Sequence, residues 1–329
     1  MRGKHFLLAA VAVAALVFGA ARLVNNGYVF FAGYVVLQYV VLATAWNILG
    51  GYTGYVNFGT AGFFALAAYT TVALEKLTPL PLPVVMLAGG VVSGLLGLGM
   101  GYLTLRLRGA FFSIATLAMA VVAQTFMVNW SFVGGSSGAF AIRPPRTALF
   151  GIDYIQYLFL LMLGLAVLVI VVARLIERSR LGDGFAAIRD DELAAEASGV
   201  PTLRLKLLAT ALSGAFMGMA GAPLPYYVTY LDPPSAFSLA YAANTIAMPL
   251  IGGTASWPGP LVGALLIATM QQVATVTISS AVNLLIVGLM LVAFVIAAPY
   301  GIIGWFGIGR PDRRRGRKRA MPKLRERDA

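Results

Sequence analysis

Few side chains in this sequence could carry out covalent or acid–base chemistry. Cysteine is absent and His5 is the only histidine, which excludes disulfides, thiol nucleophiles and Cys-ligated metals. Glu75, Asp153 and Asp232 lie at the edges of apolar stretches, so a proton relay inside a membrane has no obvious components. No Gly-Lys-Ser/Thr sequence occurs, so a P-loop for nucleotides is absent. The sequence therefore predicts no catalytic residue, no metal site and no cofactor bound by this chain itself.

Uncharged polar side chains in the apolar stretches are the groups that could contact a solute crossing a membrane. Asn57 is the leading candidate, because it follows the glycines of segment 50–54, where an unwound chain could turn into a helix and aim its N-terminal dipole at an anion. Tyr55 and Phe58 could line an apolar route or simply pack. For each polar group the alternative is a hydrogen bond between helices. The candidates for a translocation path are Asn47, Tyr52, Asn57, Thr60 and Asn244.

The elements that must position these groups are membrane-spanning helices. The chain has 329 residues, of which 60% are hydrophobic and only 11% charged, against about 25% charged in soluble proteins. No charge occurs between Asp232 and Arg310, or between Lys76 and Arg106. This composition excludes a soluble enzyme or a nucleic-acid-binding domain. It predicts an all-α, polytopic transmembrane helical bundle.

Apolar stretches of about 20 residues, the length that crosses a bilayer, recur along the chain. The region 237–300 breaks at Gly252-Gly253, at 257–260 and near Ser279-Ser280, so it fits three segments, the first of them short. Together the stretches predict about ten spans. The earlier stretches are 6–24, 29–49, 57–75, 84–104, 110–130, 153–174 and 206–228.

Glycines four residues apart recur within these stretches. Such pairs let helix backbones approach closely in lipid, and this interpretation is favoured over a role in ligand binding. The pairs are Gly90/Gly94, Gly97/Gly101, Gly214/Gly218 and Gly259/Gly263.

Positive charge predicts the orientation of the spans. Lys4 precedes the first stretch, Arg106 follows the fourth, a basic loop follows the sixth and a basic tail follows the last. Spans that leave both termini in the cytoplasm place all four clusters inside, with the loop around Arg143 as a weak exception. Residues 1–21 also resemble a cleavable signal peptide, although an even number of spans agrees better with a retained first helix.

The chain divides into a transmembrane domain, residues 1–309, and a basic cytoplasmic tail, residues 310–329, predicted to be disordered. The tail holds ten Lys/Arg and three Asp/Glu, and so contributes +7 of the net charge of +12. We expect it to enforce a cytoplasmic C-terminus and to contact anionic membrane lipid, and not to bind nucleic acid.

Residues 177–206 form the one sizeable hydrophilic insert. Good helix formers occupy 185–197, and Gly199 and Pro201 end them. Asp190 is predicted to act as the N-cap or as a first-turn acid of a second short helix. Two short helices on the cytoplasmic surface are therefore expected, either as a docking surface for a cytosolic protein or as a solvated connector. Their interrupted apolar face consists of Phe185, Ile188 and Ala195.

Four blocks within residues 38–308 occur in a specific combination. The first contains Gly-Gly-Tyr-Thr-Gly-Tyr-Val-Asn-Phe-Gly at 50–59, and the third reads Ala-Ile-Arg-Asp-Asp-Glu-Leu-Ala-Ala-Glu-Ala-Ser-Gly-Val at 187–200. In this order and spacing the chain resembles the membrane subunit of ABC importers for branched-chain amino acids, the LivM-type permease. The complete blocks are 46–70, 105–118, 187–200 followed by 206–209, and 250–264.

The resemblance implies a subunit of the bacterial inner membrane that depends on partners. A homologous second permease of the LivH type would pair with it, and two cytosolic ATPases would bind ATP and Mg. An extracytoplasmic binding protein would deliver the substrate. The third block resembles the loop that couples such permeases to the ATPases. The corresponding residues are Phe185, Arg189, Asp190, Glu192, Ala194, Ala195, Glu196 and Gly199.

Two positions depart from the family pattern. The coupling loop of importers reads Glu-Ala-Ala, three residues, then Gly, whereas Leu193 takes the acidic position here and Glu192 precedes it. Asn244 stands in a stretch where the family often has an acid, and Pro249 is expected to interrupt that short span. Two alternatives stay open: an importer of the same family for urea or short amides, and a sodium-coupled carrier or channel, since backbone carbonyls can bind Na⁺.

Overall fold

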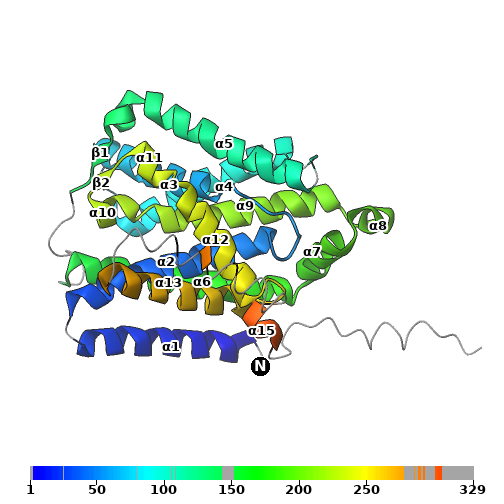
Figure 1. The fold of residues 1–329 in the computed structure, drawn as a ribbon, viewed down its shortest axis with the longest axis horizontal. Helices are drawn as coiled ribbons and strands as arrows, with labels where there is room; N and C mark the ends of the chain where they lie inside the picture. The colour runs from blue at the N-terminus through cyan, green and yellow to red at the C-terminus, as the bar shows by residue number, and fades with distance from the viewer. Residues whose placement is uncertain are drawn as a thin grey trace, which may run out of the picture.

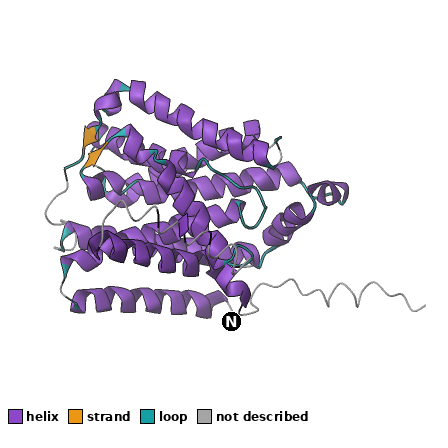
Figure 2. Cartoon of the chain, viewed as in Figure 1, coloured by secondary structure: helices purple, strands orange, loops and turns teal. Residues whose placement is uncertain are grey.

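The chain forms a bundle of helices, most of which run along one common direction (Figure 1). The computed structural model describes residues 3–24, 26–78, 80–104, 106–107, 109–142, 152–277, 285, 288–289, 292 and 301–305. Within these residues the only strands are β1, Ala139–Phe140, and β2, Tyr230–Leu231, which pair antiparallel (Figure 2). The prediction of an all-α polytopic bundle is confirmed.

Seven helices of the described residues are long and apolar enough to cross a membrane. Two further helices belong to the bundle: α3, Thr60–Leu77, and α12, Leu239–Gly252, which has only 14 residues. The seven are α1 (Gly3–Leu23), α2 (Gly27–Leu49), α4 (Leu82–Thr104), α5 (Ala110–Asn129), α6 (Tyr154–Glu177), α9 (Thr202–Gly221) continued by α10 (Leu224–Val228), and α13 (Pro258–Thr277).

The predicted number of about ten spans is not confirmed by these helices. The third segment expected in 237–300 falls almost entirely outside the described residues, as do the loop around Arg143 and the tail 310–329. The predicted breaks are confirmed where the structure describes them. The short helix α12 ends at Gly252, and α13 begins at Pro258.

The expectation that Pro249 interrupts its helix is wrong. The proline lies inside α12, and the amide of Gly253 donates to its carbonyl oxygen at 2.7 Å. Both effects of a proline inside a helix, the missing hydrogen bond from its own nitrogen and the crowding of the carbonyl four residues earlier, act on its N-terminal side. The hydrogen bonds on its C-terminal side can still form, and α12 therefore continues to Gly252.

The two ends of the bundle differ (Figure 1). One end carries the N-terminus, α15 (Gly301–Trp305), and two short helices, α7 (Arg180–Asp190) and α8 (Glu192–Ala197). The other end carries β1, β2, α10, α11 (Pro233–Ala236) and the two 3-10 turns Ser131–Val133 and Gly135–Ser137. The hydrophilic insert thus forms the two short surface helices that the sequence predicts.

The bundle is held together where glycines let helices approach. α4 and α9 pack more extensively than any other pair of described elements. A Cβ atom added at Gly97 would lie 2.9 Å from the carbonyl oxygen of Thr210, and one at Gly90 would lie 2.6 Å from the side chain of Met219. Gly218 approaches Ser93 in the same way. The interpretation of the spaced glycines as packing positions is confirmed.

Candidate functional site

Two capped helices form the insert at one end of the bundle. The hydroxyl of Ser179 accepts a hydrogen bond from the amide of Leu181 at the start of α7. At the start of α8, Asp191 Oδ1 accepts from the amide of Ala194 at 3.1 Å. The prediction that Asp190 is the N-cap or a first-turn acid of the second helix is wrong: Asp191 is the cap, one residue later, and Glu192 is the acid of the first turn. Asp190 is the last helical residue of α7, whereas Asp191 has the extended backbone that a cap requires.

The α7–α8 pair has one buried and one exposed face. Phe185, Ile188 and Ala195 are all buried, which confirms the predicted apolar face. Leu193 is 61% exposed, and Glu196, one turn further along α8, is exposed as well. An apolar side chain that projects from the tip of a surface helix is available for contact with another protein.

The remaining residues predicted for this loop lie at its surface. Asp190 is exposed, and its carboxylate lies 3.5 Å from the guanidinium of Arg189. Ala194 is exposed on α8. Gly199 follows α8 with a φ of +83°, a left-handed conformation that favours glycine. Asp190, Ala194 and Gly199 therefore lie on one surface element.

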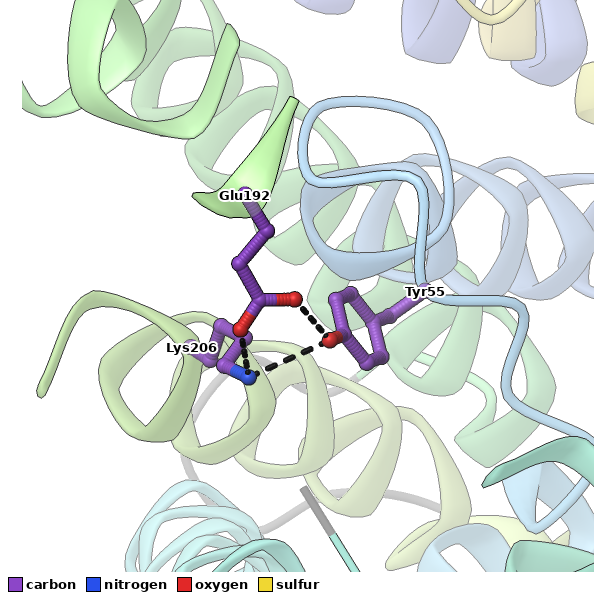
Figure 3. A network of polar contacts seen from close by, with 3 residues as sticks. All are labelled: Tyr55, Glu192 and Lys206. Carbon is purple, nitrogen blue, oxygen red and sulfur yellow. Dashed lines mark hydrogen bonds and ion pairs between the residues drawn. The ribbon is translucent and has the colours of Figure 1, made fainter. Parts of the chain in front are cut away.

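A polar triad fastens α8 to the bundle (Figure 3). The ammonium of Lys206, near the start of α9, lies 2.6 Å from Glu192 Oε1 and donates to the hydroxyl of Tyr55 at 3.1 Å. The Tyr55 hydroxyl donates to the other carboxylate oxygen of Glu192. Lys206 is only 3% exposed, so its charge is removed from water and is balanced inside the triad.

A second set of contacts joins α7 to the loop that carries Tyr55. This loop, residues 50–59, lies between α2 and α3 and is called the glycine-rich loop below. Arg189 Nη1 donates to the carbonyl oxygen of Gly51 at 3.4 Å. Gly54 has a φ of +78°, and a Cβ atom there would lie 3.2 Å from Arg189 Cγ. The stem of Arg189 therefore packs directly against the loop backbone.

Four of the five residues predicted for a translocation path lie in or beside the glycine-rich loop. Asn57 is fully buried, and its Oδ1 accepts from the amide of Gly59 at 2.7 Å, so it shapes the start of α3. The hydroxyl of Tyr52 donates to the carbonyl oxygen of Ala173 at 3.3 Å. Burial raises the pKa of that hydroxyl, which keeps it protonated. Asn47 and Thr60 are also buried.

The fifth predicted path residue, Asn244, lies elsewhere in the bundle. Its Nδ2 donates to the hydroxyl of Tyr39 on α2 at 3.2 Å, and its Oδ1 accepts from Gln271 Nε2 on α13 at 3.0 Å. The amide thus joins three helices through both of its polar atoms. This geometry favours a structural hydrogen bond between helices over direct contact with a solute.

Replacing Asn244 with leucine tests this assignment. We expect the free energy of unfolding in detergent to fall by about 1 kcal/mol, the size of a hydrogen bond between membrane helices. The KM for uptake should change by less than about twofold, because a group that only joins helices does not bind substrate in either the ground or the transition state. A large increase in KM at unchanged stability would instead place Asn244 on the path.

Sequence reasoning did not find the triad. From the sequence, Lys206 is expected to belong to the basic cluster that sets orientation and to the third block of the resemblance. Tyr55 is expected to line an apolar route or to pack, and it lies in the first block. The available signal was weak: a lysine inside the start of an apolar stretch, with a carboxylate 14 residues earlier. Such a lysine needs a partner once it is buried. Nothing in the sequence indicates that a tyrosine 151 residues away would join the pair.

Comparisons with known proteins agree with this architecture. A family model described as branched-chain amino acid transport system / permease component matches residues 28–295. The chain belongs to this family. Its members are transport permeases and not enzymes, and the seven candidate spans make this permease a multi-pass membrane protein.

Three curated relatives are similar to this permease over most of its length. Two are named high-affinity branched-chain amino acid transport system permease protein LivM. The one from Salmonella typhimurium strain LT2 is 27% identical over 92% of this chain and 75% of its own length. The one from Escherichia coli K12 is 28% identical over 80% and 67%. A probable branched-chain amino acid transport permease protein LivH from Methanocaldococcus jannaschii is 26% identical over 80% and 88%. No solved structure matches the chain significantly.

Proposed function

We propose that this permease is a membrane-spanning subunit of an ABC importer that moves branched-chain amino acids. The observation that carries the proposal is the α7–α8 pair. It projects from one end of a bundle of the branched-chain amino acid permease family and is fastened to that bundle by a buried charged triad. A solvated connector would need no such attachment, whereas a docking element that transmits force does. The exposed Leu193 would face the partner.

The proposed function also implies which proteins this permease would bind. Similarity to both LivM and LivH proteins supports pairing with a second, homologous permease. Two cytosolic ATPases would hold ATP and Mg and receive the α7–α8 pair, and an extracytoplasmic binding protein would deliver the substrate. The end with α7 and α8 is then cytoplasmic, in agreement with the basic residues around it, and the protein lies in the bacterial inner membrane with both termini inside.

ATP binding would close the two ATPases and move the α7–α8 pair with them. This motion would tilt the membrane helices and open the path between the two permeases to the docked binding protein. ATP can drive such a change only because it binds the two states with different affinity. The described interiors of α2, α4, α5, α12 and α13 carry no charged side chain, which suits the passage of a small zwitterion without tight retention.

The cytoplasmic part of the path would pass the start of α3. Asn57 Nδ2 and Thr60 Oγ1 are buried there and have no hydrogen-bond partner among the described residues. An unmet buried polar group costs about 1–3 kcal/mol, so a polar solute that reached these atoms in another state of the cycle would be stabilised by them. Asn47 and Tyr52 are the neighbouring path candidates.

Reconstitution decides between this function and its alternatives. The permease would be placed in liposomes together with the ATPases and second permease encoded beside it, with the binding protein outside. We expect leucine uptake that requires ATP inside the vesicles and does not respond to a sodium gradient. Sodium-driven uptake by the permease alone would overturn the proposal. ATP-driven uptake of urea but not of leucine would support the ABC mechanism and show that the proposed substrate is wrong.

Leu193 tests the docking surface. We expect Leu193→Asp to weaken co-purification of the ATPase by about tenfold or more, because a charge would be buried at an apolar contact. Leu193→Met, which keeps an apolar side chain of similar volume, should retain the complex. Because the site is exposed, both variants should unfold within about 0.5 kcal/mol of the unmodified chain. Equal recovery of ATPase with both variants would exclude Leu193 from the interface.

A further inference from the structure

The glycine-rich loop is bonded to the α7–α8 pair on one side and to several membrane helices on the other. On the first side lie the triad of Tyr55, Glu192 and Lys206 and the bond from Arg189 to Gly51. These contacts join α7, α8, the loop and the start of α9 over sequence separations of up to 151 residues. The loop, α8 and the start of α9 therefore meet at the triad (Figure 3), and α7 joins the loop through Arg189.

On its other side the loop reaches α5. The hydroxyl of Ser113 donates to the carbonyl oxygen of Val56 at 2.8 Å, and the amide of Phe58 donates to the hydroxyl of Thr116 at 3.0 Å. Val56 and Phe58 are two residues apart in the loop, and Ser113 and Thr116 lie one turn apart on α5, so α5 is held at two neighbouring points. Few buried side chains hold α5 elsewhere, because most of its surface lies outside the core.

The loop also reaches α6 and the turn between α12 and α13. Tyr52 donates to the carbonyl oxygen of Ala173 on α6. At the end of α2, Asn47 Nδ2 donates to the carbonyl oxygen of Thr254 at 3.2 Å. A Cβ atom at Gly51 would also approach the Thr254 carbonyl oxygen, at 2.8 Å. A displacement of the loop would therefore act on α5, α6 and the α12–α13 turn together.

The contacts on the α7–α8 side are the harder ones to break. Separating Lys206, which is 3% exposed, from Glu192 would pull opposite charges apart in a low-dielectric site, which is strongly unfavourable. The ammonium also lies 4.7 Å from the centroid of the Tyr55 ring. The contacts of the loop with α5 and with the α12–α13 turn carry no charge: they are neutral hydrogen bonds and the edge-on packing of Tyr55 against Phe112 of α5 at 5.1 Å. Neutral contacts of this kind cost less to rearrange than a buried ion pair.

From this contrast we infer that α7, α8, the start of α9 and the glycine-rich loop move as one rigid body during transport, and that the loop passes their motion to α5. Tyr55 and Lys206 are positioning residues that fasten α8 to the loop, and Ser113 and Thr116 receive the motion. The inference rests on the proposed function, because it assumes that ATPases displace the α7–α8 pair. It adds the route by which that displacement enters the membrane helices.

A cross-link tests the rigid body directly. The chain has no cysteine, so Gly54→Cys with Arg189→Cys would introduce the only two thiols. The Cβ positions lie 3.7 Å apart, within the range of a disulfide. In the reconstituted transporter, copper phenanthroline should cross-link the pair, and ATP-driven uptake should stay within about twofold of the same variant after reduction. A loss of more than tenfold on oxidation, reversed by reductant, would overturn the inference.

Tyr55→Phe provides a second measurement that does not depend on the cross-link. It removes the hydroxyl that joins Glu192 and Lys206 while keeping the ring. We expect the solute moved per ATP hydrolysed to fall about tenfold, the loss of a hydrogen bond to a charged group, with ATP hydrolysis retained. Ser113→Ala should lower the same ratio by a smaller factor. A purely structural role would lower uptake and hydrolysis together, in proportion to the folded complex.

The outcomes separate this inference from the proposed function. If the unmodified chain shows no ATP-dependent uptake with its partners, the proposed function fails. If the unmodified chain transports but Tyr55→Phe and Ser113→Ala keep its ratio of solute to ATP, only the transmission route fails. An unchanged ratio of solute to ATP in both variants would then mean that the motion of the α7–α8 pair reaches the membrane helices through α9, the other helix that the triad contacts.

Discussion

Replacing Lys206 with methionine is expected to lower the free energy of unfolding by about 3 kcal/mol, near the lower end of the range for breaking a buried ion pair. Methionine keeps most of the apolar stem and removes the ammonium. Glu192, whose side chain is only 14% exposed, would then keep a hydrogen bond from Tyr55 but lose its counter-charge. The loss should appear as an earlier transition in thermal or SDS unfolding followed by tryptophan fluorescence.

Two further variants show that the loss comes from the ion pair. Arg204 lies two residues earlier and is exposed, so Arg204→Met should change stability by no more than about 0.5 kcal/mol. The double variant Lys206→Met with Glu192→Met removes both charges, and such replacements are often neutral or stabilising. It should therefore recover most of the stability lost in Lys206→Met. Equal midpoints for Lys206→Met and Arg204→Met would contradict the buried pair.

The surface helices could be predicted because their signals are local. The spacing of Phe185, Ile188 and Ala195 indicates an apolar face on helices, and that face is buried. The break between the two helices depends on which of two adjacent aspartates becomes extended, and composition cannot separate Asp190 from Asp191. The error of one residue in the cap therefore reflects a choice that is made by the packing of α7.

The triad could not be predicted, because the signals that would indicate it are not local in the sequence. A lysine next to a span is most simply explained by orientation, and a tyrosine in an apolar stretch by packing. What joins Tyr55, Glu192 and Lys206 is the folding of three distant segments onto one point. The departure at Leu193 becomes clear in the same way: Glu192 faces the bundle, and Leu193 takes the exposed position beside it.

The number of spans could not be predicted from the sequence, because some apolar runs contain more than one helix. Apolar length alone does not distinguish a full crossing from α12, whose 14 residues are too few for the roughly 20 that a span requires. The polar candidates show a related limit. Asn57 and Asn244 are equally polar in the sequence, yet one shapes the start of α3 and the other joins three helices.

The second large effect is expected at Gly263, where even a methyl group has no room. A Cβ atom at Gly263 of α13 would coincide with the carbonyl oxygen of Met248 and lie 2.9 Å from the amide nitrogen of Gly252. Both obstacles belong to the backbone of α12 and cannot turn aside as a side chain could. Gly263→Ala should therefore push α12 and α13 apart and cost about 3 kcal/mol, the upper part of the usual range for overpacking.

Gly164→Ala on α6 is the matched control, because a Cβ atom there meets nothing within 4 Å. Alanine at such a helical site should stabilise the chain by about 0.5–1 kcal/mol through the lower entropy of its unfolded state. The two variants add the same methyl group to a spanning helix, so their midpoints in detergent should move in opposite directions. Similar shifts would mean that the α12–α13 contact is not made by backbone.

Gly263→Ala should also affect transport more than its stability alone predicts. The α12–α13 turn holds Thr254, whose carbonyl oxygen accepts the amide of Asn47 beside the glycine-rich loop. Separation of the two helices would displace this acceptor and weaken the tie between the turn and the loop. If the loop carries the motion of the α7–α8 pair, a transporter assembled from folded Gly263→Ala permease and its ATPases should still hydrolyse ATP but take up less solute per ATP. Uptake that falls only with the folded fraction would confine the role of this glycine to packing.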